Sequence, residues 1–451
     1  MFPEKWQKMA KIDAPPTIRA YTLGCKVNFC DTNALLEAAI AAGFVRAAEG
    51  SQADAVVVNA CAVTSHSIAK TRALVRRVRA RQREAIILLT GCAVKANEPQ
   101  LLAMKEVDHF FREPNEALAW LGRWYGLNPQ PHSGGLDPER TRAFLKIQDG
   151  CDSFCSYCIV PIVRGKPQSL APSSVMAALR RAVAGGYREI ILSGIHLGHY
   201  GRDLEGVTLA ALLKQIAGEE GDFRVRLSSI EPLEATEPLL ATMALSKRFC
   251  PHLHLPLQSG SDRVLSEMRR PYNRQKYMEV VGTARRMLDN PAITTDIMVG
   301  FPGETEDDHR RTLDAIAEIG FARSHVFVYS PRPGTAAAAL PDRVDPNTAR
   351  RRSRQARDAA LEAARRFREG LVGTVARVLP EEMVAGRREG FCERYQRVRF
   401  AGEMGLEKRF ADVYISGTVA SDQDVLEGRL IPGDGNGGSY ECHVRDGAPQ
   451  V

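Results

Sequence analysis

The chain has 451 residues, and its 44% hydrophobic and 25% charged residues are ordinary for a globular protein of two or three domains. Its formal net charge is +7, and no apolar run approaches the ~20 residues that a membrane helix needs, which argues against a membrane-spanning protein. The first residues lack the apolar stretch of a signal peptide, so the sequence predicts a cytoplasmic location.

Residues 17–130 alternate short apolar runs with helical patterns, which predicts an open, doubly wound α/β domain. Strands are expected at 18–24, 54–60 and 85–91, and helices at about 31–42, 65–82 and 98–104. The stretch 126–141 is rich in proline, glycine and polar residues, so we expect it to link this domain to the next.

Three cysteines of this domain, Cys25, Cys61 and Cys92, each follow a predicted strand directly. Because the carboxyl ends of neighbouring parallel strands meet at one edge of a sheet, we expect these cysteines to converge on one site. A small buried residue without chemistry is the alternative for any one of them. Cys30 lies in the following loop or helix start and is left out of this set.

Residues 141–370 carry six β/α repeats, which favour a partial (β/α)6 barrel with a trailing helix. Its strands are expected at 143–149, 189–195, 224–230, 252–258, 293–301 and 324–330. Its helices are expected at 173–184, 208–217, 236–245, 274–288, 305–319 and 346–369. Residues 371–446 lack helical periodicity, and their strand-like pieces predict a small antiparallel β-barrel, which a generic capping domain could equally provide.

Cys151, Cys155 and Cys158 follow the first of these strands with the spacing C-x3-C-x2-C. Three thiolates leave a four-ligand metal site one ligand short. Zinc is one interpretation, with His196 or His199 as the fourth ligand, although both histidines lie on a different repeat. An iron–sulfur cluster is the other, and the absence of a second close cysteine pair favours it.

The motifs around both sets of cysteines resemble those of the radical S-adenosylmethionine (SAM) methylthiotransferases. "LGCKVNFCDTN", "NACAVT" and "TGCAV" resemble the N-terminal domain of these enzymes, and "GCDSFCSYCIVPIVRG", "HLHLPLQSGSDRVLSEMRRPY" and "DIMVGFPGET" resemble their barrel. "GFCERYQRVRF" resembles their C-terminal RNA-binding barrel, called TRAM. The resemblance covers nearly the whole chain in the expected order. Within the family, "LGCKVN" resembles the subfamily that acts on N6-threonylcarbamoyladenosine beside the tRNA anticodon.

The resemblance implies two [4Fe–4S] clusters, each with one iron left open. Cys151, Cys155 and Cys158 are the implied catalytic ligands of the cluster that binds SAM, and Cys25, Cys61 and Cys92 are the implied ligands of an auxiliary cluster that supplies sulfur. The family places SAM along the strand ends, which makes the candidate SAM contacts Tyr157, Ser193, Gly194, Gln258, Ser259, Asp296 and Gly300. A core hydrogen bond or a strand-end cap is the alternative role for Gln258 and Asp296, and packing is the alternative for Tyr157.

The implied reaction converts N6-threonylcarbamoyladenosine at tRNA position 37 to its 2-methylthio derivative. Phosphate contacts are expected from the basic segment 70–83 and from Arg394, Arg397 and Arg399, and Tyr395 is a candidate for stacking on a base, although solvated surface residues are the simpler interpretation. The alternatives are a methylthiotransferase for isopentenyladenosine tRNA or a ribosomal-protein aspartate, and a non-catalytic, zinc-dependent RNA-binding protein. The sequence identifies neither the electron donor nor the sulfur source, and nothing in it demands an oligomer.

Overall fold

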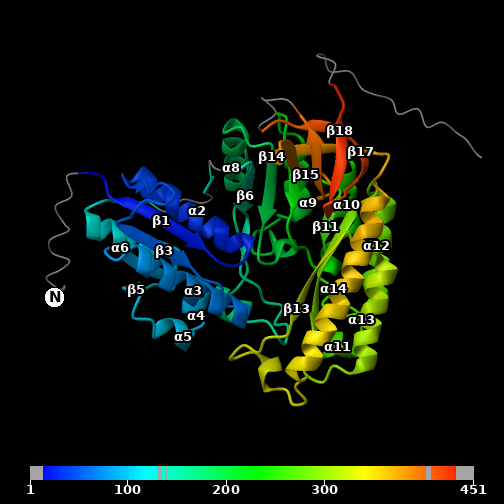
Figure 1. Cartoon of the computed structure of the whole chain (residues 1–451), viewed down its shortest axis with the longest axis horizontal. Coiled ribbons are helices and arrows are strands. Elements are labelled where there is room, and N and C mark those ends of the chain that lie inside the picture. Colours follow the sequence, from blue (N-terminus) through cyan, green and yellow to red (C-terminus); the bar gives the residue numbers. More distant parts are fainter. Residues whose placement is uncertain (1–13, 131–134, 138–139, 403–407, 433–451) are drawn as a thin grey trace, which may run out of the picture. The chain divides into compact units, whose positions relative to one another are not determined.

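The computed structural model describes residues 14–130, 135–137, 140–402 and 408–432 (Figure 1). The chain divides into two compact units, residues 1–370 and 371–451. Within the part of the chain that is described, no helix is both long enough and apolar enough to cross a membrane. The last part of the predicted third domain, 433–446, lies outside the described residues.

The N-terminal part of the first unit is a parallel five-stranded sheet in the order β2-β1-β3-β4-β5 (Figure 1). Its strands are β1 (Thr17–Thr22), β2 (Val45–Arg46), β3 (Ala55–Asn59), β4 (Ile86–Thr90) and β5 (His109–Phe110). Its helices are α2 (Lys26–Ala41), α3 (Ser65–Arg81), α4 (Cys92–Lys95), α5 (Pro99–Leu102) and α6 (Pro114–Tyr125). Helices α2 and α6 share one hydrophobic core with the sheet, and α3, α4 and α5 share a second core with its other face. The predicted doubly wound α/β fold is confirmed.

The strands and helix α3 lie where the sequence predicts them, and the differences are in short or capped elements. Strands β2 and β5 have two residues each, which is too few for a period-two pattern. Helix α2 begins at Lys26, five residues before its predicted start, directly after Cys25. Helix α6 was not predicted, although Pro114 at its first turn and the capping box of Glu113 with Glu116 are signals of a helix start.

Six parallel strands follow in two three-stranded sheets, β10-β9-β6 and β11-β12-β13. Isolated parallel bridges, Val225 with Phe249 and Ser229 with His254, connect the two sheets. The strands are β6 (Arg142–Lys146), β9 (Glu189–Ser193), β10 (Arg224–Leu227), β11 (His252–His254), β12 (Ala292–Val299) and β13 (Arg323–Val328). The main helices are α8 (Pro172–Ala184), α9 (Leu209–Ala217), α10 (Glu237–Ala244), α12 (Arg274–Met287), α13 (Glu306–Ile319) and α14 (Pro346–Glu369). The shorter elements are β7 (Gln148–Asp149), α7 (Val160–Arg164), β8 (Gln168–Ser169), η1 (Leu197–His199), η2 (Pro232–Glu234), α11 (Asp262–Glu267) and η3 (Ala336–Ala339).

The two faces of these strands differ in polarity. Alternate residues such as Leu145 and Leu192 belong to the large hydrophobic core shared with the helices. On the opposite face, buried Glu189 accepts hydrogen bonds from Arg224 and Arg226. Burial alone would raise the pKa of Glu189, but the two guanidinium groups outweigh burial and hold it well below its ordinary value. This fully paired ionic cluster gives the strands a rigid polar face.

The C-terminal unit is a closed barrel in the order β14-β15-β16-β18-β17. Its strands are β14 (Val375–Val384), β15 (Arg387–Cys392), β16 (Arg397–Ala401), β17 (Ala411–Val419) and β18 (Asp422–Leu430). Four of its five pairings are antiparallel, and β16 with β18 is parallel, unlike the all-antiparallel arrangement that the sequence predicted. The predicted small β-barrel is otherwise confirmed.

Candidate active site

Cys151, Cys155 and Cys158 lie in one loop between β7 and α7. The Cys151 N–H donates to the carbonyl of Gly165 (3.0 Å), and Ser156 Oγ donates to the carbonyl of Glu267 (2.7 Å), so the loop is anchored near its start and within it, between Cys155 and Cys158. The three thiols lie close enough that the charges of Cys155 and Cys151 affect the pKa of Cys158. Burial raises the pKa of Cys158 to about 12. The loop thus brings three sulfur ligands together and leaves their thiolates in need of positive partners.

Arg270 supplies one such partner. Its Nη1 donates to Cys155 Sγ at 3.2 Å, and its guanidinium also pairs with Glu231 and contacts Tyr272 Oη at 2.8 Å. Burial raises the pKa of Cys155, and the positive charge of Arg270 counters part of that effect. A buried arginine held by a carboxylate and a phenol is fixed in place, so it can stabilise a thiolate without rearranging.

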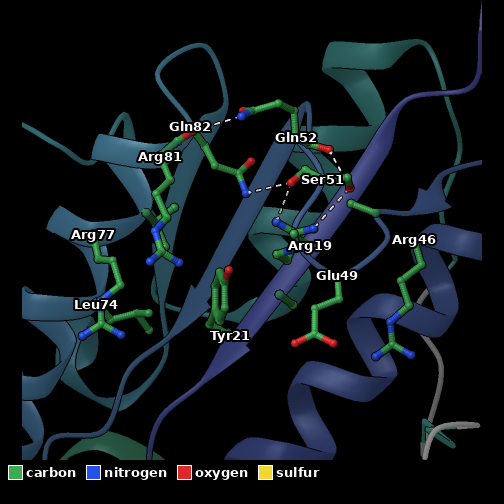
Figure 2. Close-up of a pocket in the computed structure, with 14 residues that line it drawn as sticks. Arg19, Tyr21, Arg46, Glu49, Ser51, Gln52, Leu74, Arg77, Arg81 and Gln82 are labelled. Atoms are coloured by element: carbon green, nitrogen blue, oxygen red, sulfur yellow. Dashed lines mark hydrogen bonds between the residues drawn. The ribbon is translucent and has the colours of Figure 1, made fainter.

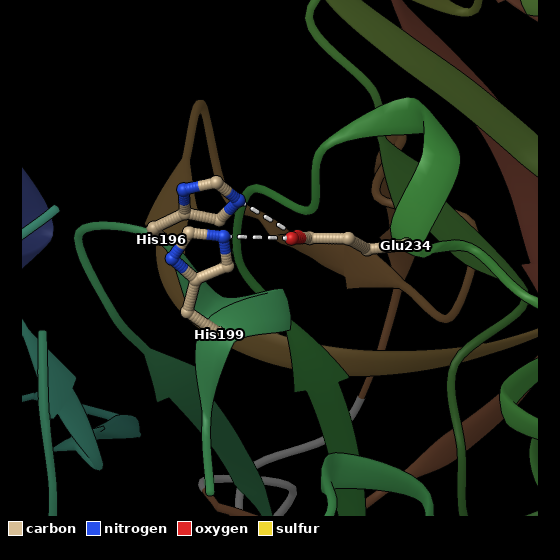
Figure 3. A group of neighbouring side chains, drawn as sticks. All are labelled: His196, His199 and Glu234. Carbon is tan, nitrogen blue, oxygen red and sulfur yellow. Dashed lines mark hydrogen bonds and ion pairs between the residues drawn. The ribbon is translucent and has the colours of Figure 1, made fainter. Parts of the chain in front are cut away.

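His196 supplies a second partner, through its contact with Cys151, and Figure 3 shows it beside His199 and Glu234. Its Nδ1 lies 3.3 Å from Cys151 Sγ, and its Nε2 lies 2.8 Å from Glu234 Oε2. The His199 ring stacks on the His196 ring at 3.4 Å, and its Nε2 lies 3.1 Å from the other Glu234 oxygen. Burial opposes a charge on His196, but the contacts with Cys151 and Glu234 raise its pKa to about 9. The Cys151 thiol, whose pKa burial would raise, is shifted below its ordinary value by hydrogen bonds from His196 and Ser153.

This histidine cluster corrects one step of the sequence reasoning. His196 was set aside as a ligand because it lies on a different repeat, yet the fold places its ring in contact with Cys151. Ligand atoms of His196, His199 and Glu234 all lie within 4.8 Å of one another, which is a spacing that suits a metal ion. Distance alone therefore does not remove the zinc interpretation. In the described structure, however, the Glu234 carboxylate is already engaged by both rings.

Cys25, Cys61 and Cys92 follow β1, β3 and β4, and the structure brings them together at one edge of the sheet. The charges of Cys25 and Cys61 both affect the pKa of Cys92, which burial raises. Cys61 and Cys92 are buried, and Cys25 is exposed, so the group opens to one side. Gly24 has a φ of +119°, and a Cβ there would lie 2.8 Å from Cys61 Cβ, which explains why the chain carries glycine beside Cys25.

Arg164 joins the two groups of cysteines, and the sequence analysis did not single it out. It ends helix α7, six residues after Cys158, and its Nε donates to Cys92 Sγ at 3.2 Å. Its Nη1 pairs with Asp31 (2.8 Å) and Asp149 (2.9 Å), and its side chain is only 6% exposed. The only available signal was its place in the quoted "CIVPIVRG" motif. A buried ion-pair network therefore fastens the first cysteine group to the segment that follows the second.

Of three candidate SAM contacts on the strands, Ser193 and Gly194 lie at the carboxyl end of β9, and Asp296 lies in the middle of β12. Ser193 is fully buried at the end of β9, and its hydroxyl has no hydrogen-bond partner among the described residues. A Cβ at Gly194 would lie 3.0 Å from Gln148 Oε1, so the chain passes closely there. Asp296 on β12 is flanked by His254 Nε2 and His325 Nδ1, each at 3.4 Å. Burial would raise the pKa of Asp296, but the two histidines outweigh it and hold the pKa below its ordinary value.

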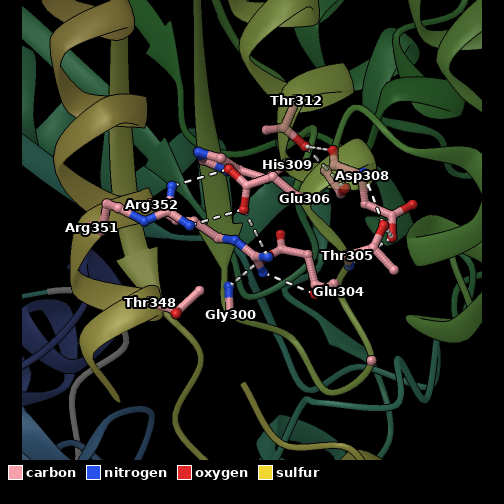
Figure 4. A network of polar contacts seen from close by, with 12 residues as sticks. Gly300, Glu304, Thr305, Glu306, Asp308, His309, Thr312, Thr348, Arg351 and Arg352 are labelled. Atoms are coloured by element: carbon pink, nitrogen blue, oxygen red, sulfur yellow. Dashed lines mark hydrogen bonds and ion pairs between the residues drawn. The ribbon is translucent and has the colours of Figure 1, made fainter. Parts of the chain in front are cut away.

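The other candidates are built into loops with internal contacts. Gln258 has a φ of +66° and its N–H donates to the carbonyl of Asp296 (2.8 Å), while Ser259 Oγ lies 3.3 Å from Thr312 Oγ1. The Gly300 N–H donates to Glu304 Oε2 (2.7 Å), which opens the polar network of Figure 4. In that network Arg352 Nη1 contacts the Glu304 carboxylate at 2.9 Å, so α14 holds the loop after β12. Tyr157 packs against the hydrophobic cluster of Val264, Met268, Phe301 and Ala337.

The candidate tRNA contacts differ in their exposure and in their contacts with the rest of the protein. On α3 and just after it, Lys70, Arg76, Arg77, Arg81 and Arg83 are exposed. In the C-terminal unit, Arg397 and Arg399 both pair with the buried Glu389 carboxylate, and the Arg399 side chain is only 11% exposed. Tyr395 stacks on Phe391 at 4.9 Å. Arg397 and Arg399 thus contribute to the barrel itself, whereas Arg77 and Arg81 of α3 face solvent and Arg79 pairs with Asp108.

Comparisons with known proteins identify the family. The family described as "Radical SAM superfamily" matches residues 145–316, and "Uncharacterized protein family UPF0004" matches residues 17–112. Threonylcarbamoyladenosine tRNA methylthiotransferase MtaB of Bacillus subtilis (strain 168) is 34% identical over 422 residues, which cover 88% of this chain and 93% of the relative. The protein of the same name from Thermotoga maritima is 34% identical and covers 92% and 99%. The chain belongs to the radical SAM methylthiotransferase family.

Other relatives agree with this family. A tRNA-2-methylthio-N(6)-dimethylallyladenosine synthase of Geobacter metallireducens is 33% identical over 437 residues, which cover 88% of this chain and 94% of the relative. Among solved structures, the radical SAM methyltransferase TsrM from Kitasatospora setae, with cobalamin and a [4Fe-4S] cluster bound, has a TM-score of 0.54 at 13% identity, covering 72% of this chain and 74% of that chain. That likeness shows a shared fold. The protein is an enzyme, and as a radical SAM methylthiotransferase it uses SAM and [4Fe–4S] clusters.

The residues present fit those cofactors. In each group the charges of the thiols influence one another, and at the sheet edge Cys25 Sγ and Cys92 Sγ lie 4.0 and 3.7 Å from the same atom, Asn28 Oδ1. None of the described cysteines is in a disulfide. Thiolate sulfur is the ligand that iron–sulfur clusters require, and hydrogen bonds to that sulfur tune them. Arg270 and His196 supply such contacts at one group, and Arg164 supplies one at the other.

Proposed function

We propose that this methylthiotransferase acts on N6-threonylcarbamoyladenosine at tRNA position 37 and converts it to the 2-methylthio derivative. The observation that carries the proposal is the pair of separate three-cysteine groups joined by Arg164, because a radical site and a sulfur-donating site must serve one substrate. The choice of substrate is supported by the names of the two MtaB relatives and by the "LGCKVN" motif.

We assign Cys151, Cys155 and Cys158 to the cluster that binds SAM, and the ligand set Cys25, Cys61 and Cys92 to the auxiliary cluster. When bound, these cofactors supply one-electron cleavage of SAM and the sulfur for insertion. The chain holds the ligand thiolates in place through Arg270, His196 and Arg164, whose side chains are themselves fixed by ion pairs.

The barrel strands contribute the polar surroundings of SAM and the base. Asp296 stays ionised between two histidines and is therefore a hydrogen-bond acceptor. At the end of β9, Ser193 offers an unpartnered hydroxyl among the described residues, and Gly194 offers a closely packed backbone. We propose Asp296, Ser193 and Gly194 as SAM contacts. The polar groups of Gln258, Ser259 and Gly300 are already hydrogen-bonded within the protein, so we propose that these residues shape the loops around SAM.

Mass spectrometry of tRNA nucleosides from a deletion strain tests the substrate. We expect 2-methylthio-N6-threonylcarbamoyladenosine to disappear and to return when the gene is supplied on a plasmid. Persistence of that nucleoside, in a strain without a second such enzyme, contradicts the proposal. Loss of 2-methylthio-isopentenyladenosine, or of methylthiolation on a ribosomal protein, would identify one of the alternative substrates.

The metal content tests the enzyme against a zinc-dependent RNA-binding protein. Protein purified without oxygen should be brown, absorb near ~400 nm and carry about eight irons if both clusters are [4Fe–4S]. A colourless protein with one zinc for each cysteine group contradicts both cluster assignments, whatever RNA it binds.

We also propose three domains, with the boundaries 17–130, 141–370 and 371–446. We propose that the protein is cytoplasmic and that tRNA is its macromolecular partner. The third domain has the strand content of a small RNA-binding barrel, which supports its assignment as TRAM. The electron donor and the sulfur source are separate partners.

A further inference from the structure

The N-terminal sheet has one strand face that its own helices do not cover. The chain crosses from β2 to β3 through residues 47–54, all described, which contain no helix. In a doubly wound fold each such crossover usually carries a helix that packs on the sheet. Because that helix is missing, a groove of about 630 Å³ lies between β1, the 47–54 loop and α3.

The groove is strongly basic (Figure 2). Arg19, Arg46, Arg77 and Arg81 line it, against one carboxylate, that of Glu49. Residues 74, 77, 78 and 81 share one face of α3, and Figure 2 shows Arg77 and Arg81 beside Tyr21, which lies on β1 at the floor. A second cavity of about 460 Å³ shares Arg81 and continues past Arg83, but Asp54 and Glu84 also line it, so the excess of positive charge is confined to the first groove.

Hydrogen bonds hold the walls of the groove in place, whereas two of its arginine side chains can still bind a ligand. Arg19 donates to the carbonyl of Ser51 at 2.9 Å, and Gln52 Nε2 donates to the carbonyl of Arg81 at 3.0 Å, so the loop is fastened on both sides. Arg46 pairs with Asp137. In the described part of the chain, the side chains of Arg77 and Arg81 have no hydrogen-bond or ion-pair partner. Charge of one sign on a preformed concave surface attracts a polyanion.

We propose that this groove binds the phosphodiester backbone of the RNA substrate, with Arg77 and Arg81 as the phosphate contacts. The inference rests on the proposed function in one respect, namely that the substrate is an RNA. Guanidinium groups suit phosphate because they donate two parallel hydrogen bonds, and Tyr21 offers a ring on which an unpaired base can stack. The groove lies outside both cysteine groups, so it anchors RNA without touching the target base.

The test compares two double variants of the full-length, cluster-loaded enzyme. Arg77→Glu with Arg81→Glu reverses the charge of the groove, and Arg112→Glu with Arg123→Glu is the matched control, because these two exposed arginines lie in α6 or just before it, and α6 packs on the other face of the sheet. Binding of a synthetic anticodon stem–loop hairpin is measured by fluorescence anisotropy between about 50 and 200 mM salt. Arg77→Gln with Arg81→Gln repeats the test without adding negative charge.

We expect the groove variant to bind the hairpin about tenfold more weakly at low salt, with a slope of log Kd on log salt reduced by about 2. The control should retain at least most of its affinity, and all variants should keep their iron content and their SAM cleavage in the absence of RNA. An unchanged Kd and slope overturns the proposal, as does an equal loss in the control, which would reflect net charge alone. Competition by millimolar inorganic phosphate that abolishes the difference would indicate a site for small phosphates, and also overturns it.

Hairpins with and without the threonylcarbamoyl group separate this inference from the proposed function. The groove contacts the backbone, so the loss of affinity should be the same for both hairpins. If the wild-type enzyme binds RNA through the groove but methylthiolates a different nucleoside, the substrate assignment fails and the groove stands. If it modifies threonylcarbamoyladenosine but the groove variant binds normally, the groove fails alone.

Discussion

Each cysteine group offers three thiol ligands, but the two groups are assembled in opposite ways. Cys151, Cys155 and Cys158 lie within eight positions of one loop, so their proximity follows from local chain geometry. Cys25, Cys61 and Cys92 come from three strand ends and meet only when β1, β3 and β4 pair in register. One group is thus available as soon as its loop forms, whereas the other depends on a complete sheet.

The partners of the two groups differ in the same way. At the loop, Arg270 and His196 come from within the barrel repeats. At the sheet edge, the basic partner of Cys92 is Arg164, which belongs to the segment after the other cysteine group. The auxiliary group therefore takes electrostatic support from the barrel, whereas the described hydrogen bonds to the loop sulfurs come from the loop itself and from the barrel. This asymmetry predicts that changes around the loop group impair the auxiliary group, whereas loss of an auxiliary ligand leaves the loop group functional.

The largest effect is expected from Cys155→Ala. Loss of one of three sulfur ligands should abolish SAM cleavage, and with it every product, because the remaining two cannot hold the cluster. Cleavage is measured as release of 5′-deoxyadenosine from the reconstituted, reduced enzyme. Cys392→Ala is the control, since Cys392 is buried in the C-terminal unit. Cleavage at the wild-type rate would show that the loop group is not the SAM site.

Cys61→Ala is expected to separate the two groups. SAM cleavage should persist at about the wild-type rate, while methylthiolated nucleoside falls below detection, because only the auxiliary ligand set is broken. The iron content should fall to about half of the wild-type value. Formation of the methylthio product by this variant would contradict the division of labour between the groups, and loss of cleavage would contradict the one-way dependence described above.

Arg164→Met should show the link between the groups in a milder form. Removing the donor to Cys92 should lower the one-electron reduction potential of the auxiliary cluster by about 65–130 mV, since a charge-assisted hydrogen bond of about 1.5–3 kcal/mol is lost. The carboxylates of Asp31 and Asp149 keep Lys146 as a partner and are not left wholly unpaired. We therefore expect the free energy of unfolding to fall by about 3 kcal/mol, at the low end for a broken buried ion pair. Potentiometric titration followed by electron paramagnetic resonance measures the shift.

The Arg164 result is specific only if an ordinary arginine behaves differently. Arg123→Met on α6 changes an exposed side chain and should leave both potentials unchanged. Equal shifts of both clusters in Arg164→Met would mean that the arginine acts through general folding rather than through its contact with Cys92.

The smallest effect is expected from His196→Ala. Cys151 keeps the N–H of Ser153 at 3.5 Å, so the loop should still hold its cluster after the ring is lost. We expect SAM cleavage to slow by several fold with an unchanged iron content, since one hydrogen bond to a ligand sulfur typically contributes about 1 kcal/mol. His66→Ala, an exposed residue of α3, is the control. A loss of half the iron would instead make His196 a metal ligand.

The order of the elements and both sets of cysteines were evident in the sequence, because periodicity and short spacings are local properties. The apolar runs at 54–60 and 85–91 were predicted as buried strands, which the structure confirms, and each ends directly before a cysteine. The C-x3-C-x2-C spacing placed three thiols in one loop with no need of a fold. Two-residue strands and the start of α2 escaped prediction because they depend on neighbouring strands and on one backbone turn.

The tertiary structure alone decided which side chains support those cysteines and where a basic groove forms. Arg164 and Cys92 are 72 residues apart, and His196 and Cys151 are 45 apart, so no local spacing could relate them. The basic groove exists because one crossover lacks a helix, which leaves a strand face open beside α3. Short sequence motifs identify the ligands. Contacts across a sheet edge arise only from packing, because they join segments that are distant in the sequence and share no local pattern.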